Sequence, residues 1–325
     1  MVHAIRIHKP GGAEELKFEE VEVGAPGAGQ IRLKQTAIGL NFIDVYHRTG
    51  LYPIAQLPAV IGMEAAGVVE AVGSGVDGLK KGDRVAYGGG PLGAYAEARL
   101  IDAVKVVKLP DAIDDRTAAA IMLKGMTAHY LLRRVYEVKR GDTILIHAAA
   151  GGVGLIACQW AKALGATVIG TVGSKEKAAQ AKAHGCDHPI LYREEDFATR
   201  VRELTEGEGV PVVYDSVGKD TFMKSLDALR PFGVMALFGQ SSGPVPPVDL
   251  GVLAQKGSLY VTRPTLMTYV AKRADLDWAA RELFEVVGSG KVKIEINQTY
   301  PLAETARAHR DLEARKTTGS TLLLP

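Results

Sequence analysis

The segment from Gly141 to Gly154 constrains the fold more than any other part of the sequence. Thr143 to Ala148 is a short, mostly apolar run, which is typical of a strand covered on both faces. The glycine-rich residues 149–154 follow, and apolar residues then recur at helical spacing as far as Leu164, with Gly165 next. The sequence therefore predicts a strand, a tight glycine turn and the start of a helix.

This predicted turn suits the pyrophosphate of a dinucleotide. Gly151 and Gly152 let the backbone approach a phosphate closely, and Gly154 lets the helix pack tightly on the strand. The helix N-terminus offers free N–H groups and the positive end of the helix dipole, so we predict that Gly151, Gly152 and Val153 bind the pyrophosphate. The first glycine of the G-x-G-x-x-G pattern is Ala149 here, so a plain strand–helix turn is the alternative.

Composition narrows the class of protein. A chain of 325 residues is long enough for two domains, and its net charge of +2 gives no strong field to attract nucleic acid or a membrane. No apolar run is long enough to span a bilayer, and the N-terminus lacks the apolar core of a signal peptide. Cys158 and Cys186 are the only cysteines, so we expect reduced thiols in a cytoplasmic protein.

The pattern of the chain changes at about residue 126. Before it, alternating strands such as 30–36 and glycine turns such as 73–78 predict a β-rich, barrel-like domain. After it, predicted strands alternate with predicted helices, which implies a parallel, doubly wound α/β sheet. The strands are expected at 143–148, 167–172, 188–192, 210–215 and 233–239, and the helices at 174–184, 194–205 and 220–229. Helices around 266–287 and a terminal strand at 320–324 are expected to return to the first domain.

The residues after the second predicted strand indicate which nicotinamide cofactor is used. NAD-selective folds place an acid there for the ribose 2′-hydroxyl, but the first acid after Thr143 is Glu176. The segment Gly173-Ser174-Lys175-Glu176-Lys177 instead puts two lysines in a first helical turn, where they oppose the helix dipole unless an anion binds. We therefore predict that Gly173, Ser174 and Lys177 bind the 2′-phosphate of NADPH and that Tyr192 closes this pocket. Solvated surface lysines are the alternative.

Several motifs together resemble a known family. Gly141-Asp142-x-x-Leu145-x-x-x-Ala149-Ala150-Gly151-Gly152-x-Gly154-x-x-x-x-Gln159-x-x-Lys162 resembles the signature of quinone oxidoreductases, in the medium-chain dehydrogenase/reductase superfamily. The segments 38–44, 62–67 and 80–85 resemble that family's catalytic domain in the same order, so the resemblance covers the whole chain.

The resemblance implies a two-domain enzyme. It implies a GroES-like catalytic domain in residues 1–125, completed by about 266–325, and a Rossmann NADPH-binding domain in residues 126–265. It also implies a cytosolic homodimer that reduces quinones with NADPH. A reductase of enones or alkenals is a close alternative, and an NADPH-sensitive RNA-binding regulator is another. The modest charge and the absence of an aromatic-basic RNA motif argue against the regulator.

The chain departs from the zinc-dependent relatives of this family. Asn41 stands where a zinc alcohol dehydrogenase has its first cysteine ligand, and Met63 stands where it has a histidine ligand. The loop 87–98 contains no cysteine, and zinc needs several converging N, S or O ligands, so we predict no metal. His147, next to the nucleotide turn, is expected to be packed or hydrogen-bonded rather than a ligand.

Quinone reduction needs less assistance than alcohol oxidation, because the negative charge spreads into an aromatic hydroquinone. Hydrogen-bond donors and correct positioning can suffice. The candidate donors are Asn41, Tyr46 and Tyr52, which the resemblance places in the cleft near the nicotinamide. For each tyrosine the alternative is a core residue whose hydroxyl is already hydrogen-bonded.

Further cofactor contacts are expected outside these motifs. Thr127 is a candidate for the nicotinamide ribose, with an ordinary helix residue as the alternative, and Asn41 is also a candidate cofactor contact. The resemblance adds positions at strand ends and two arginines, for one of which, Arg315, a surface charge is the alternative. These added positions are Ser216, Phe238, Gly239, Gln240, Ser241, Arg263 and Arg315.

Overall fold

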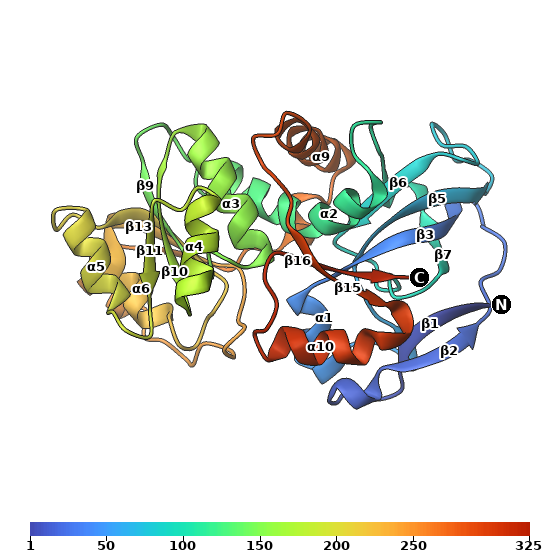
Figure 1. Ribbon diagram of the computed structural model, residues 1–325, viewed down its shortest axis with the longest axis horizontal. Coiled ribbons are helices and arrows are strands. Elements are labelled where there is room, and N and C mark those ends of the chain that lie inside the picture. The colour runs from blue at the N-terminus through green and yellow to red at the C-terminus, as the bar shows by residue number, and fades with distance from the viewer. The chain divides into compact units, whose positions relative to one another are not determined.

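The computed structural model describes residues 1–325, and the chain divides into two compact units (Figure 1). The first unit contains Met1–Met126, Val270–Gly288 and Ile294–Pro325, and the second contains Thr127–Tyr269 and Ser289–Lys293. These limits differ by a few residues from those predicted, and the short segment 289–293 belongs to the second unit.

The first unit is built around a seven-stranded sheet. Its strand order is β15-β16-β3-β5-β6-β8, and β7 also pairs with β3. A second sheet has the order β2-β1-β4 and is antiparallel. The strands are β1 (Val2–Ile7), β2 (Lys17–Val21), β3 (Gln30–Leu40), β4 (Ala59–Val60), β5 (Glu64–Val72), β6 (Arg84–Gly88), β7 (Ala98–Asp102), β8 (Val107–Lys108), β15 (Ile296–Pro301) and β16 (Ser320–Leu324).

Strand β3 organises this unit because it pairs with β5, β7 and β16. Ile31 and Leu33 are buried while the alternate residues Arg32 and Lys34 are more exposed, which is the alternation that the sequence shows. Thr321 pairs with Leu40, so the terminal strand returns to the first unit, as predicted.

The first unit has four helices longer than one turn. They are α1 (Phe42–Thr49), α2 (Asp115–Tyr130), α9 (Arg273–Gly288) and α10 (Thr305–Glu313), and the boundary between the units falls inside α2. Short 3₁₀ turns lie at Ala13–Glu15, Ala103–Lys105 and Leu302–Glu304. Helix α1 follows β3 directly and ends at Gly50, whose φ of 81° is a left-handed conformation that glycine adopts without strain.

The second unit contains a six-stranded, wholly parallel sheet with the order β11-β10-β9-β12-β13-β14. The order reverses beside β9, so this is the predicted doubly wound α/β sheet. Its strands are β9 (Thr143–Ile146), β10 (Thr167–Val172), β11 (His188–Leu191), β12 (Val210–Asp215), β13 (Leu229–Leu237) and β14 (Tyr260–Thr262). Its helices are α3 (Gly152–Leu164), α4 (Lys175–Ala183), α5 (Phe197–Leu204), α6 (Phe222–Ala228), α7 (Gly251–Gln255) and α8 (Leu266–Tyr269), with a π-helical turn at Leu131–Val135.

The helices of the second unit cover its sheet in pairs. Helix α3 contacts α4, and α5 contacts α6, and each of the four packs on a strand of the sheet. A core of apolar residues such as Leu145, Ile169 and Val213 lies under α5 and α6. None of the helices in either unit combines the length and the apolar character that a bilayer crossing requires.

Candidate active site

The turn between β9 and α3 has the form predicted for a dinucleotide-binding turn. Gly151 is the N-cap of α3, and no side chain caps the helix, so its first N–H groups can bind an anion. A Cβ atom on Gly154 would lie 2.3 Å from the carbonyl oxygen of Ala148, so only glycine lets the helix approach the turn this closely.

The turn between β10 and α4 contains the residues predicted to select NADPH. Ser174 is the N-cap of α4, and its Oγ accepts the backbone N–H of Lys177 at 3.3 Å. A hydrogen bond from Ser174 also lowers the pKa of the exposed Glu176 carboxyl. A Cβ atom on Gly173 would lie 3.2 Å from the Tyr192 hydroxyl, so Gly173, Ser174 and Tyr192 lie together.

The residues predicted after β12 and β13 also lie together. The Ser241 N–H donates to the Ser216 carbonyl at 3.1 Å, and a Cβ atom on Gly239 would lie 2.6 Å from that same oxygen. The Phe238 N–H donates to the carbonyl of Asp215 at 2.8 Å. These contacts stand at the carboxyl ends of two adjacent parallel strands, which is where such sheets bind ligands.

The remaining predicted cofactor residues are more scattered. Thr127 is buried in α2, and Arg263 directly follows β14. Arg315 follows α10 with a φ of 58°, and it belongs to the first unit, as Asn41 does. All the other predicted cofactor residues belong to the second unit.

Asn41 is buried, and the NH₂ group of its side chain has two partners within the first unit. Its Nδ2 donates to Glu64 Oε2 at 2.7 Å and to the Gly39 carbonyl at 3.4 Å. Because an ionised carboxylate only accepts hydrogen bonds, the NH₂ group must face Glu64. Asn41 can therefore not donate to a quinone without losing one of these bonds, whereas its Oδ1 is suited to accept a hydrogen bond from a ligand hydroxyl.

Glu64 fixes this orientation and was missed by the sequence analysis. Its buried carboxylate also accepts the Lys124 ammonium at 2.9 Å and the Leu123 N–H at 2.7 Å. A Cβ atom on Gly39 would lie 2.1 Å from Glu64 Oε2, so a glycine is required beside the carboxylate. The sequence signal for these two residues was their position: Glu64 lies in the segment 62–67 that resembles the family's catalytic domain, and Lys124 lies three residues before the candidate Thr127.

The two predicted tyrosines lie together. The ring centroids of Tyr46 and Tyr52 are 5.1 Å apart with an interplanar angle of 62°, and the Tyr52 N–H donates to the Tyr46 carbonyl at 3.0 Å. Tyr46 is buried and Tyr52 is partly exposed. Phe42 adds a third ring, 5.5 Å from Tyr46.

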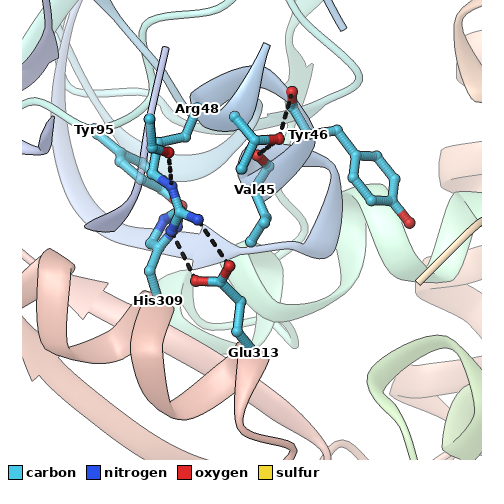
Figure 2. A network of polar contacts seen from close by, with 8 residues as sticks. Val45, Tyr46, Arg48, Tyr95, His309 and Glu313 are labelled. Atoms are coloured by element: carbon cyan, nitrogen blue, oxygen red, sulfur yellow. Dashed lines mark hydrogen bonds and ion pairs between the residues drawn. The ribbon is translucent and has the colours of Figure 1, made fainter. Parts of the chain in front are cut away.

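A polar network, buried except for Glu313, anchors helix α1, which carries Tyr46 (Figure 2). Tyr95 donates its hydroxyl proton to Asp44 Oδ2 at 2.8 Å and lies 3.0 Å from His309 Nε2. Arg48 lies 3.1 Å from His309 Nδ1 and binds both carboxylate oxygens of Glu313, at 2.7 and 2.8 Å. Since Arg48 can only donate, the neutral ring of His309 carries its proton on Nε2 and donates to Tyr95.

Two pKa values in this network are strongly shifted. Burial raises the pKa of Asp44 to about 7, and only one of its oxygens has hydrogen-bond partners. Burial, reinforced by the Arg48 charge, lowers the pKa of His309 to about 3.

His147 and the two cysteines lie in the interior of the second unit. His147 is buried and hydrogen-bonded to Thr171 and Ser225, which confirms the prediction for this residue. Cys158 and Cys186 are buried free thiols. No group of three or more His, Cys, Asp or Glu side chains is arranged to hold a metal ion.

Two family models match the chain. The model described as "Alcohol dehydrogenase GroES-like domain" matches residues 27–111, and the one described as "Zinc-binding dehydrogenase" matches residues 152–283. Together with a parallel Rossmann sheet and a separate β-rich unit, these matches define a medium-chain dehydrogenase/reductase.

Individual relatives narrow the class. A quinone oxidoreductase of Pseudomonas aeruginosa is 56% identical over 325 residues, with both chains fully covered. The structure of Escherichia coli quinone oxidoreductase complexed with NADPH is 52% identical with a TM-score of 0.98, covering 99% of this chain and 100% of that one. A 2-haloacrylate reductase from a Burkholderia species is 51% identical, covering 100% of this chain and 99% of its own. The chain belongs to the quinone oxidoreductases of this superfamily.

Proposed function

We propose that this protein is an NADPH-dependent quinone reductase that transfers reducing equivalents from NADPH to quinones without zinc. The observation that carries this proposal is the full-length match to an Escherichia coli quinone oxidoreductase whose structure contains NADPH. We also propose a cytoplasmic location, because both cysteines are free thiols, and cell fractionation would test it.

The turns of the second unit fit NADPH. The uncapped start of α3 at Gly151, Gly152 and Val153 would hold the pyrophosphate. Ser174 and Lys177 would bind the 2′-phosphate after Ser174 releases Glu176, and Tyr192 would close that pocket. The close approach of the Ala148 carbonyl at Gly154 leaves no room for a side chain, as a backbone cradle for a ligand requires, and a Cβ atom on Gly173 would crowd the Tyr192 hydroxyl.

Further proposed contacts for NADPH come from the strand ends and from isolated side chains. The Ser216 turn and residues 238–241 would contact the dinucleotide at the ends of β12 and β13. Only the family resemblance supports Thr127, Arg263 and Arg315 as contacts for NADPH, and we keep them as proposed contacts. Bound NADPH supplies the hydride.

The first unit would hold the quinone. The hydroxyl of Tyr52, and less readily that of the buried Tyr46, would donate to a quinone oxygen and stabilise the charge that develops there. The Asn41 amide, held by Glu64, would accept a hydrogen bond through Oδ1 from a hydroxyl group of the cofactor. This assigns Asn41 to cofactor binding rather than to proton donation.

The absence of a zinc requirement is supported by the residues themselves. The Asn41 nitrogen is committed to Glu64, and Met63 offers only a buried thioether, which is a poor zinc ligand. The only cation bonded to Glu64 in this cluster is the Lys124 ammonium. Metal analysis of active protein would test this point, and stoichiometric zinc needed for activity would contradict it.

The 51% identity to a 2-haloacrylate reductase favours one second candidate, the reduction of activated carbon–carbon double bonds. Both reactions deliver hydride to an electron-poor conjugated system. Stopped-flow measurement of NADPH oxidation with quinones, enones and 2-haloacrylates separates the two. We expect the largest kcat/KM for a quinone, and a larger value for any of the alkenes would make double-bond reduction the main activity.

In the same assay, Tyr52→Phe should lower kcat/KM for quinones about tenfold, because one hydrogen bond to the developing charge is lost. Tyr300→Phe, in strand β15 of the first unit, is the matched control: it loses one hydrogen bond, from the Tyr300 hydroxyl to Asp311 at 2.9 Å, and should leave kcat/KM unchanged. Unchanged turnover and quinone affinity in Tyr52→Phe would remove Tyr52 from the mechanism.

We also propose that the protein is a homodimer formed through the edge strand β14. This strand pairs only with β13, and its Tyr260 and Val261 are 62% and 40% exposed. Phe232 and Leu250 in the same unit are 70% and 75% exposed, and an apolar strand edge of this kind is suited to pairing with a second copy. Val261→Lys should halve the mass measured by light scattering, and an unchanged mass would exclude this interface.

A further inference from the structure

A buried carboxylate organises the end of strand β12. Asp215 has no exposed surface, and its Oδ1 accepts the N–H groups of Val217 at 2.7 Å and Gly218 at 3.1 Å. Its Oδ2 accepts the hydroxyls of Thr221 at 2.7 Å and Ser225 at 3.2 Å. The Ser216 turn therefore wraps around Asp215, and its backbone conformation depends on that carboxylate.

The network continues from Asp215 through two more side chains. Ser225 Oγ lies 2.9 Å from His147 Nε2, and His147 Nδ1 lies 2.8 Å from Thr171 Oγ1. All these side chains are buried, and burial lowers the pKa of His147, which keeps its ring neutral.

The donor and the acceptor of every hydrogen bond between Asp215 and Thr171 follow from the Asp215 carboxylate. A carboxylate only accepts, so Ser225 gives its single proton to Asp215 and accepts from His147 Nε2–H. A neutral ring protonated on Nε2 must accept at Nδ1, so Thr171 donates to His147. The relay thus runs one way, from Thr171 through His147 and Ser225 to Asp215.

This relay joins the ends of three adjacent strands. Thr171 lies in β10, His147 directly follows β9, and Asp215 ends β12. The backbone adds two ties, because the Ala149 N–H donates to the Thr171 carbonyl and the His147 N–H donates to the Tyr214 carbonyl, each at 3.0 Å. Each strand end leads into a segment proposed to bind NADPH, namely residues 151–153, 173–177 and 216.

We propose that Asp215 and His147 are positioning residues of the dinucleotide site, and that their one-way relay holds the three binding turns in register with one another. This inference rests on the proposed function. It assigns no contact with the cofactor to either side chain, since both are buried and act through the turns that follow them.

The decisive variant is Asp215→Asn, which keeps the shape of the side chain but replaces one acceptor oxygen with an NH₂ donor. If Oδ1 still holds the Val217 and Gly218 N–H groups, the NH₂ group faces Ser225, which must then donate to His147. The proton of His147 is expected to move from Nε2 to Nδ1. We expect long-range ¹H–¹⁵N spectra of the ligand-free protein to show this tautomer change at one of the eight histidines.

The same variant should weaken cofactor binding. We expect the Kd of both NADPH and NADH, measured by nicotinamide fluorescence, to rise at least tenfold, because the pyrophosphate turn serves both cofactors. Ser225→Ala, which interrupts the relay but leaves the Asp215 turn intact, should give a smaller rise in the same direction. It also keeps the proposal testable if Asp215→Asn does not fold.

Asp187→Asn is the matched control. This carboxylate precedes β11 in the same sheet and accepts the Val168 N–H at 2.9 Å and the Lys162 ammonium at 2.5 Å. It stands at the amino ends of the strands, so its loss should lower the melting temperature without changing either Kd.

The possible results distinguish a failure of the positioning role of Asp215 and His147 from a failure of the proposed function. Unchanged cofactor affinity in both relay variants, or an unchanged His147 tautomer in Asp215→Asn, would overturn the inference. A wild-type protein that binds no NADPH would instead contradict the proposed function, and the tautomer measurement would still test the direction of the relay.

Discussion

Lys177→Ala should weaken NADPH binding about 30-fold and leave NADH binding nearly unchanged, because a hydrogen bond to a charged group contributes about 2 kcal/mol. Lys177 lies in the first turn of α4, and its backbone N–H donates to the side chain of the N-cap residue Ser174. A 2′-phosphate bound there would meet the ammonium of Lys177 and the dipole of the helix together. The measurement is the Kd of each cofactor by fluorescence titration.

Two neighbours in the same turn provide the controls. Lys175 is exposed, and Lys175→Ala should change the affinity for either cofactor by less than threefold. Glu176 accepts a hydrogen bond from Ser174, so Glu176→Gln should strengthen NADPH binding by weakening that hydrogen bond and removing a negative charge. Equal losses of NADPH and NADH affinity in Lys177→Ala would contradict the phosphate role of this lysine.

Local patterns were enough to predict much of the second unit. Strands β10 and β12 have the predicted limits because each is an apolar, β-branched run between turn residues. Helix α5 begins at Phe197 rather than at the predicted Glu194, because the side chain of Asp196 caps the helix by accepting the Thr199 N–H. The helical periodicity was present, but only the cap defines where the helix starts.

The ends of strand β13 were also not predictable from local patterns. It spans Leu229–Leu237, whereas the prediction was 233–239. The strand pairs with β12 from Leu229 through an irregular register near Val210 and Val212. The limits of β13 are set by its pairing with β12, which no local sequence pattern reveals.

The polar contacts of the first unit could not be predicted from the sequence because their partners are far apart along the chain. Glu64 and Lys124 are 60 residues apart, and Tyr95 and His309 are 214 residues apart. The sequence placed Asn41 among the candidate residues, yet its hydrogen-bonding direction depends on Glu64, which only the folded sheet brings beside it. Residue types suggested candidate positions, and tertiary packing determines which of their atoms are available to a ligand.

Asp44→Asn should change how the stability of the protein depends on pH. Burial raises the pKa of Asp44 from 3.8 to about 7, so the native protein holds a proton that the unfolded chain releases. This contribution to stability is complete below pH 3.8 and is lost as the pH rises through 7. The pKa of His309 is lowered from 6.5 to about 3, so its contribution is present above pH 6.5 and is lost as the pH falls through 3.

Between about pH 4 and 6.5 the two contributions have opposite slopes and nearly cancel in the wild-type protein. Asp44→Asn removes only the Asp44 contribution, which falls as the pH rises. The free energy of unfolding of the variant should therefore rise with pH relative to that of the wild type, by about 1 kcal/mol per pH unit. Urea unfolding at pH 4.5, 5.5 and 6.5 measures this slope. His309→Gln leaves Asp44 in place and should tilt the profile the other way. If the Asp44→Asn profile runs parallel to that of the wild type, Asp44 does not carry a raised pKa in the native protein.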